Sequence, residues 1–259
     1  MKIRLLATAS VVLASSLISF PTFAIVNVEQ AIIGPAEDGL TNKVELSIDG
    51  ASGNTVKNSS RAEWLTQWQY GEHTDFIWLQ YAYGKSSGKV DTNRFFAHLR
   101  HRTQIGDSWG GELFVQSGRD PFARMQQRTL GGAGVRYSLL EEVDSVAVYL
   151  GLGGFYEYEK LSPKAGTTDA LTSRTWRANS YLVYIHQLNE QVRLYSTTYY
   201  QPAFNNVSDY RLLEQFAFAV KLNENIDLKL NVDVTYDALP PQGVKKTDAR
   251  YSTGLSMSF

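Results

Sequence analysis

The stretch Ile226-Asp-Leu-Lys-Leu-Asn-Val-Asp-Val-Thr-Tyr-Asp237 decides the fold class. Its apolar residues recur at every second position, and every residue between them is polar. This alternation is typical of a β-strand with two unlike faces, because successive side chains of a strand point to opposite sides. One such strand fits a soluble sandwich as well as a membrane barrel, so the number and length of such segments must distinguish the two.

Eleven further segments alternate in the same way, and most of the twelve are 9–13 residues long. Strands of globular proteins have a mode of about 5–6 residues, whereas a tilted membrane strand needs about 9–11. The length therefore favours a membrane barrel. The predicted strands are 43–51, 60–70, 75–85, 93–103, 109–118, 127–138, 145–158, 174–186, 192–201, 209–222, 226–237 and 247–259.

The connections between these segments alternate between short and long, as in outer-membrane barrels with short periplasmic turns and longer outer loops. The sequence thus predicts an all-β, transmembrane, antiparallel up-and-down barrel of about twelve strands. The first strand should pair with the last, since an unpaired edge in hydrocarbon costs several kcal/mol per backbone group. The short connections are 71–74, 105–108, 140–144, 189–191 and 223–225, and the longer ones are 53–59, 86–92, 119–125, 159–173, 202–208 and 238–246.

The N-terminus has the pattern of a secretory signal peptide, predicted to cover residues 1–24. Lys2 and Arg4 precede an apolar run from Leu5 to Phe20, and Thr22-Phe23-Ala24 places small residues at the cleavage positions. Residues 25–41 follow as a periplasmic N-terminal segment, either a tether or a plug inside the lumen, and residues 42–259 form the barrel. The expected location is the outer membrane of a Gram-negative envelope, with the protein integral to it.

The C-terminal segment ends in an alternating face that closes on Phe259. Tyr251, Leu255, Met257 and Phe259 resemble the C-terminal signal of outer-membrane barrels, so the barrel-insertion machinery is an expected partner. Aromatic residues, 12% of the chain, cluster near the predicted strand ends. Such rings favour the headgroup level of a bilayer, which makes outer-membrane lipids the second expected partner.

Three stretches resemble a bacterial family of unknown function, the salt-induced outer membrane proteins (YdiY-like). They are Val44–Thr55 with its Ser-Gly-Asn-Thr bend, Ala82-Tyr-Gly-Lys-Ser-Ser-Gly88, and the glycine-spaced Leu130–Tyr137. The resemblance extends over roughly residues 42–259. It implies an outer-membrane barrel and supplies no functional residues.

Composition excludes several functions. Without Lys2 and Arg4, 23 of the 25 basic side chains remain against 26 acidic ones, so nothing indicates a nucleic-acid partner. There is no cysteine and no metal-ligand spacing among the four histidines, so neither a metal nor another cofactor is expected.

The alternation also assigns charged side chains to the barrel interior. A basic wall is expected on the fourth, sixth and eighth strands, opposite an acidic wall on the first, eleventh and twelfth. Such charges tune which small ions or polar solutes pass through a pore. The candidate lumen charges are Arg94, His98, Arg100, Arg102, Arg128, Arg136 and Arg177 on the basic wall, and Glu45, Asp49, Asp227, Asp233, Asp237 and Asp248 on the acidic wall.

Glycines form a second interior feature, with Gly132 and Gly134 on one strand and Gly151 and Gly153 on the next. Small residues on adjacent strands leave a recess, which could receive an aromatic ring such as Phe96 or Phe114, hold solute or mark a bend.

The function predicted from these features is a narrow porin-like channel for small polar solutes or ions. A filled structural or envelope-stress barrel without transport is the alternative, because charges in a dry interior must pair. A lipid-modifying enzyme is a third hypothesis, but no serine lies at a matching height beside the outward-facing His101 or His186. The prediction is therefore that the protein is not an enzyme, with no catalytic residue, no cofactor-binding residue and no metal site.

Overall fold

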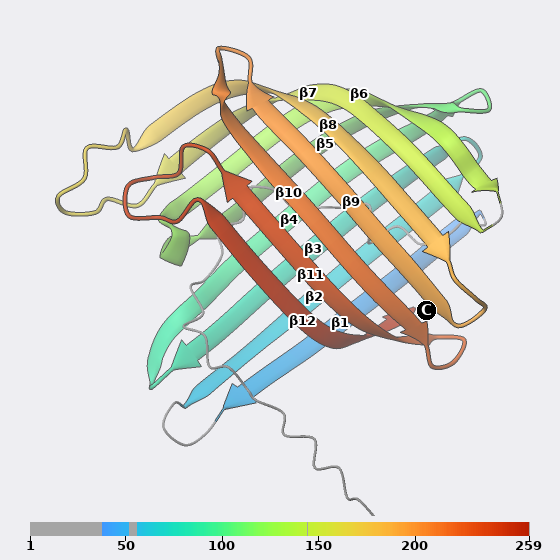
Figure 1. Ribbon diagram of the computed structural model, residues 1–259, viewed down its shortest axis with the longest axis horizontal. Helices are drawn as coiled ribbons and strands as arrows, with labels where there is room; N and C mark the ends of the chain where they lie inside the picture. The colour runs from blue at the N-terminus through green and yellow to red at the C-terminus, as the bar shows by residue number, and fades with distance from the viewer. Residues whose placement is uncertain (1–37, 52–55, 144, 259) are drawn as a thin grey trace, which may run out of the picture.

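The computed structural model describes residues 38–51, 56–143 and 145–258, and of residues 49–51, 142 and 143 the backbone only. Twelve antiparallel strands follow one another around a closed barrel (Figure 1). All twelve predicted strands are confirmed. They are β1 (Gly39–Ala51), β2 (Lys57–Tyr70), β3 (His73–Ser86), β4 (Lys89–Ile105), β5 (Trp109–Asp120), β6 (Met125–Val143), β7 (Val146–Leu161), β8 (Thr172–Gln187), β9 (Val192–Ala203), β10 (Asn206–Lys221), β11 (Ile226–Asp237) and β12 (Thr247–Ser258), with a 3₁₀ turn η1 (Pro121–Ala123) after β5.

The barrel closes between its first and last strands. β1 pairs with β12 from Lys43 opposite Ser258 to Leu46 opposite Leu255, and on its other side with β2. These four residue pairs close the sheet into a barrel, and a spanning sheet in lipid needs such closure. β1 begins at Gly39, three residues before the predicted start of the barrel. The predicted signal peptide and residues 25–37 lie outside the described part of the chain.

The two faces of β11 show which face of the sheet lines the barrel interior and which faces outward. Lys229, Asp233 and Asp237 are buried in the barrel interior, whereas Leu228 and Leu230 on the other face are 39% and 43% exposed. This arrangement is the reverse of a soluble protein, which buries its apolar face. The polar face therefore lines the interior and the apolar face meets lipid, as in membrane barrels.

Aromatic pairs stand near both ends of the strands. Trp109 and Tyr137 lie 4.7 Å apart between ring centroids near the short turns, and Tyr156 and Trp176 lie 5.1 Å apart towards the other end. Two such bands suit the two headgroup levels of a bilayer. Among the described residues, no helix has the length and apolar character needed to cross a membrane.

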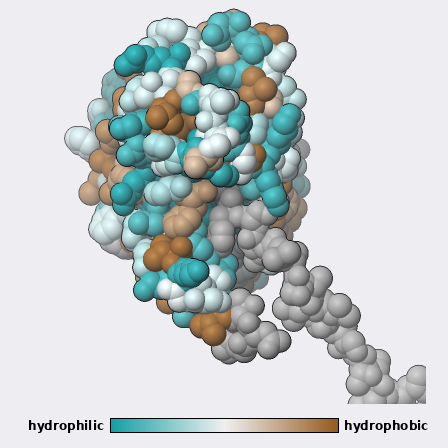
Figure 2. All heavy atoms as spheres, turned by 90° about the vertical axis from the view of Figure 1, so that its left-hand side faces the viewer, coloured by the Kyte–Doolittle hydropathy of each residue, from teal (hydrophilic) through white to brown (hydrophobic). Residues whose placement is uncertain are grey.

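The two longest connections described, 162–171 and 238–246, lie at the same end of the barrel (Figure 1). Viewed from that end, the surface consists mainly of hydrophilic and intermediate residues (Figure 2). Two connections at this end are shorter than predicted. The loop predicted at 86–92 is a turn of Ser87 and Gly88, whose φ angles of 49° and 79° match the tight hairpin turns that follow strand twist. The loop predicted at 202–208 is residues 204–205.

Of the four interior glycines of β6 and β7, Gly132 and Gly151 make room for aromatic rings, and Gly134 and Gly153 lie close to the backbone of the neighbouring strand. A Cβ added at Gly151 would lie 2.0 Å from the Tyr181 ring, and one at Gly132 would lie 2.7 Å from the Phe114 ring and 2.5 Å from the Gly154 carbonyl oxygen. The recess predicted from these glycines is therefore occupied by side chains of this same chain, among them the anticipated Phe114.

Replacing Gly132 by alanine should destabilise the barrel, by about 1–3 kcal/mol in free energy of unfolding, because the new methyl group meets backbone as well as ring atoms. Urea unfolding in phospholipid vesicles, followed by tryptophan fluorescence, measures the change. Gly131→Ala is the matched control, since a Cβ there finds its nearest neighbour at 3.8 Å. Equal losses in the two variants would contradict the close packing of β6 against β7.

Candidate functional site in the barrel interior

The structure places most of the predicted lumen charges inside the barrel. Arg102, Glu45 and Asp227 are partly buried, and the side chain of Asp49 lies outside the described residues. The fully buried members of the predicted set are Arg94, His98, Arg100, Arg128, Arg136, Arg177, Asp233, Asp237 and Asp248.

Sequence reasoning missed further interior charges that obey the same alternation. Each of them lies an even number of residues from an assigned residue on its own strand, or from a residue that pairs with an assigned face on the neighbouring strand. Extending the every-second-residue pattern along all strands would therefore have found them. They are Lys43, Arg61, Asp120, Glu157, Arg211, Lys229 and Arg250.

The expected separation into a basic and an acidic wall is wrong. Lys229, Lys43 and Arg250 stand on the strands assigned to the acidic wall, and Glu157 stands between the arginine-bearing strands β6 and β8. Charges of both signs therefore alternate around the ring. Opposite charges therefore stand close to one another on both sides of the interior, where they pair.

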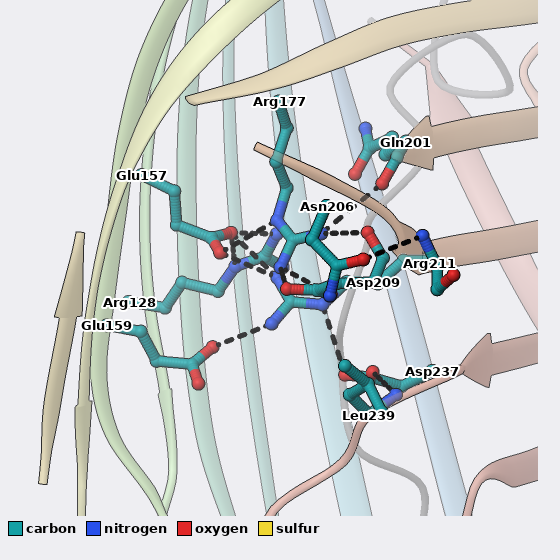
Figure 3. A network of polar contacts seen from close by, with 11 residues as sticks. Arg128, Glu157, Glu159, Arg177, Gln201, Asn206, Asp209, Arg211, Asp237 and Leu239 are labelled. Atoms are coloured by element: carbon teal, nitrogen blue, oxygen red, sulfur yellow. Dashed lines mark hydrogen bonds and ion pairs between the residues drawn. The ribbon is translucent and has the colours of Figure 1, made fainter. Parts of the chain in front are cut away.

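Glu157 on β7 is the centre of one ion-pair network (Figure 3). Its carboxylate accepts from Arg128 Nε at 2.5 Å, from Arg177 Nε at 3.3 Å and from Arg211 Nη1 at 2.8 Å. Arg177 also donates to both carboxylate oxygens of Asp209, at 3.0 and 3.1 Å. Because β7 and β10 are three strands apart, the contact between Glu157 and Arg211 crosses the interior instead of following the wall.

Glu112 on β5 is the centre of a second network. It accepts from Arg102 Nε at 2.8 Å and from the Tyr181 hydroxyl at 2.7 Å, and Arg100 Nη1 lies 3.6 Å from its carboxylate. Tyr181 belongs to β8, again three strands away. This is a second contact across the interior.

Apolar side chains fill the space beside these networks. Tyr181, Val183, Tyr199 and Leu213 form one buried cluster, and a second contains Phe114, Leu130 and Phe155. All belong to strands from β5 to β10. These clusters are packed like a protein core, and a cavity lined by Gln116, Arg128 and Gln201, among others, remains beside them.

The opposite side, from β11 through β12 and β1 to β2, is polar and less tightly enclosed. We call its interior side chains the polar seam: Glu45, Arg61, Glu63, Lys229, Asp233 and Arg250. Lys229 Nζ lies 3.6 Å from Glu45, Arg61 lies 3.8 Å from Glu63, and Arg250 Nε donates to Asp233 at 3.0 Å. The side chains of Glu45, Arg61, Glu63 and Arg250 are 14–17% exposed, against 2% for Glu157 and 3% for Arg128.

Arg124, in the left-handed conformation directly after η1, joins three connections at the end with the long loops. It donates to Asp169 Oδ2 at 2.6 Å and to the Gln242 carbonyl at 2.8 Å. The Gln242 backbone N–H in turn donates to Asp169 Oδ1 at 3.0 Å. We call Arg124, Asp169 and Gln242 the loop latch, because they tie the β7–β8 and β11–β12 loops to each other and to the β5–β6 connection.

The C-terminal strand presents its apolar residues outward, with Tyr251, Leu255 and Met257 all exposed. Phe259 lies outside the described residues. Recognition of this strand by the insertion machinery stays a prediction. Within the described residues, no group of three or more His, Asp or Glu side chains is arranged to hold a metal ion.

Comparisons with known proteins agree with this architecture. A family described as "Protein of unknown function, DUF481" matches residues 44–259, and the salt-induced name is not part of that description. The translocator domain of the autotransporter NalP from Neisseria meningitidis is 14% identical, with a TM-score of 0.53 over 90% of this chain and 91% of its own. The NanC porin is 13% identical, with a TM-score of 0.50 over 84% of this chain and 98% of its own. A search of curated proteins finds no significant match.

Glu157→Gln should lower the free energy of unfolding by about 3–5 kcal/mol, because three guanidinium groups lose their shared buried counter-charge. Urea unfolding in phospholipid vesicles measures the loss. Glu159→Gln is the control, since that carboxylate is 13% exposed and pairs at 3.1 Å with Arg211. A loss for Glu157→Gln no greater than for the control would show that the network does not centre on Glu157.

Proposed function

The chain belongs to the DUF481 family, and from this membership and its membrane-barrel fold we propose that it is an integral outer-membrane protein acting as a narrow porin-like channel. The polar seam is the passage, and small polar solutes or ions are what it passes. The NalP domain and the NanC porin support the membrane-barrel part of this proposal through their shared fold.

The difference in exposure between the two sides of the interior carries the proposal. Glu45, Arg61, Glu63 and Arg250 of the seam are 14–17% exposed, whereas Glu157 and its three arginines are 2–7% exposed. Solvated charges replace part of the hydration shell of a passing ion, and an apolar wall cannot do this. The apolar clusters on β5–β10 and the cross-interior contacts interrupt the other side of the interior, which holds cavities lined by Gln116 and Arg128, so we take the seam as the route.

The same contacts restrict what can pass. Arg211 reaches Glu157 and Tyr181 reaches Glu112 across the interior, so a solute has only part of the barrel cross-section. The loop latch further narrows access at the end with the long loops. We therefore expect water, small ions and small polar molecules to pass, and folded chains or long oligomers to be excluded.

A filled barrel without transport is the second candidate. The cross-interior ion pairs favour it, because they could fix the seam side chains as firmly as the packed side. In that case the protein would serve as a rigid envelope component. Electrical recording distinguishes the two candidates.

The channel proposal predicts a small, steady conductance when the purified full chain, folded in detergent, is inserted into planar bilayers. Arg250→Ala should raise that conductance, because it removes a long side chain from the seam, whereas Arg128→Ala on the packed side should change it much less. Both variants remove one interior arginine that pairs with a carboxylate, so the comparison tests its position. Absence of conductance at every voltage from correctly folded protein would establish the filled barrel instead, and equal effects of the two variants would exclude the seam as the route.

The loop latch predicts that the conductance is the same at pH 7 and at pH 5. Hydrogen bonds from the Gln242 backbone N–H and the Arg124 guanidinium lower the pKa of Asp169 below its ordinary value. Because this pKa is lowered, the stabilisation of the latch by the ionised Asp169 carboxylate is fully present above the ordinary pKa of about 3.9. It is lost only as the pH falls through the lowered pKa of Asp169. Conductance that depends on the latch should therefore not change between pH 7 and pH 5.

Asp169→Asn should raise conductance at pH 7 by releasing the latch, and the control Asp107→Asn, in the turn after β4, should not. Single-channel recordings at pH 7 and pH 5 check both statements. An increase in wild-type conductance between these two pH values would contradict the assignment of Asp169 to the latch.

A further inference from the structure

A cluster of polar side chains lies on the outer, lipid-facing side of β2, β3 and β4, at the end with the short turns. His101 Nδ1 lies 2.8 Å from Asp75 Oδ1, and His101 Nε2 lies 2.9 Å from Thr103 Oγ1. A carboxylate, an imidazole and a hydroxyl are thus joined in one line. This is the arrangement of orienting acid, general base and nucleophile that hydrolases use, whichever fold carries it.

When the His101 ring is neutral, the chemistry of the groups sets the direction of each contact. An ionised Asp75 can only accept, so with a neutral ring His101 carries its proton on Nδ1 and presents a lone pair at Nε2. That lone pair accepts the hydroxyl proton of Thr103. The proton of the hydroxyl is therefore already directed to the base that would remove it.

Two further side chains complete the cluster. The Tyr70 hydroxyl donates to Asp75 Oδ2 at 2.8 Å and so holds the carboxylate in place. His73 Nδ1 lies 3.0 Å from Thr103 Oγ1, and its ring is stacked on that of His101 at 5.5 Å. Since the Thr103 proton is directed to His101, His73 must donate to the threonine oxygen. This contact holds the threonine oxygen in place beside His101.

The surroundings indicate the substrate. Trp68, Ile77, Leu99 and Ile105 stand on the same outward face and are all exposed, with Leu99 at 53% and Ile105 at 59%. Cross-strand pairs place Ile77 opposite Leu99, one step further from the turns than Asp75 opposite His101. The polar cluster therefore meets the headgroup level while the apolar face continues into the hydrocarbon. Acyl ester groups of phospholipids lie at this boundary.

We propose that Thr103, His101 and Asp75 form an acyl-ester hydrolase site for phospholipids at this membrane boundary. Thr103 Oγ1 attacks the ester carbonyl carbon as His101 Nε2 takes the hydroxyl proton. The bond to the glycerol oxygen breaks, that oxygen takes the proton from His101, and the lysophospholipid leaves. Water, deprotonated by His101, then attacks the acyl-threonine and releases the fatty acid, with the proton returned to Thr103.

This proposal does not rest on the channel proposal, because the interior takes no part in it. It also revises the sequence expectation that the protein has no catalytic residues. That expectation considered a serine partner for the outward histidines, whereas the hydroxyl beside His101 is a threonine two residues along the same strand.

The experiment uses the full chain folded into unilamellar vesicles of phosphatidylethanolamine and phosphatidylcholine with radiolabelled acyl chains. The wild type should release fatty acid and lysophospholipid. Thr103→Val should abolish release, His101→Asn should reduce it at least about 100-fold, and Thr103→Ser should retain it. Thr66→Val is the matched control, since Thr66 is an outward threonine of β2 bonded to Asn42 and Trp64.

A fluorophosphonate probe gives a second reading that does not depend on turnover. It should attach to Thr103 with loss of fluoride, as located by mass spectrometry, and attachment should fail in His101→Asn. Folding of each variant is checked by its heat-dependent shift in gel mobility. No fatty-acid release from folded wild type, or equal release from wild type and Thr103→Val, would overturn the proposal, and so would probe attachment elsewhere.

Discussion

The barrel depends on one constraint, namely that no backbone N–H or C=O may be left without a hydrogen bond in hydrocarbon. The pairing of β1 with β12 answers this constraint by closing the sheet into a barrel. Closure then forces every strand to present one face to lipid and the other to an enclosed interior. The apolar residues of β11 consequently face out, and Lys229, Asp233 and Asp237 face in.

An enclosed polar face creates a second requirement, because charges away from bulk water need partners. The interior meets it through networks that draw on several strands at once. Glu157 forms ion pairs with three arginines from β6, β8 and β10, and Glu112 accepts hydrogen bonds from Arg102 and Tyr181. These contacts pull side chains across the interior on the β5–β10 side. The glycines of β6 and β7 deepen the asymmetry by letting Tyr181 and Phe114 settle against the wall. On the other side, the charged side chains of the polar seam are more exposed than Glu157 and Arg128.

Much of this architecture follows from the sequence, because alternation is a local property of each strand. The twelve strands, the closure and the lipid-facing side could all be predicted from it. Strand ends were harder to place, since a two-residue turn such as Ser87-Gly88 lets strands extend into a stretch that reads as a loop. The prediction of a basic and an acidic wall was wrong for a different reason, because it assigned only some of the interior charges. Glu157 places a negative charge among the predicted basic strands, and Lys229 places a positive charge on a predicted acidic strand. Contacts across the interior depend on register and on tilt around the whole ring, which no single strand encodes.

The alternation also gives the two faces of β4 different environments. On β4, Arg100 and Arg102 point into the interior towards Glu112, while His101 and Thr103, which alternate with them, point to lipid. A shift of β4 by one residue would exchange the two sets, placing arginines in hydrocarbon and the histidine cluster inside. The ion pairs with Glu112 oppose such a shift, because it would leave a buried carboxylate without its partners. The ion pairs with Glu112 thus favour the face of β4 that points His101 outward, on the side where it meets Asp75.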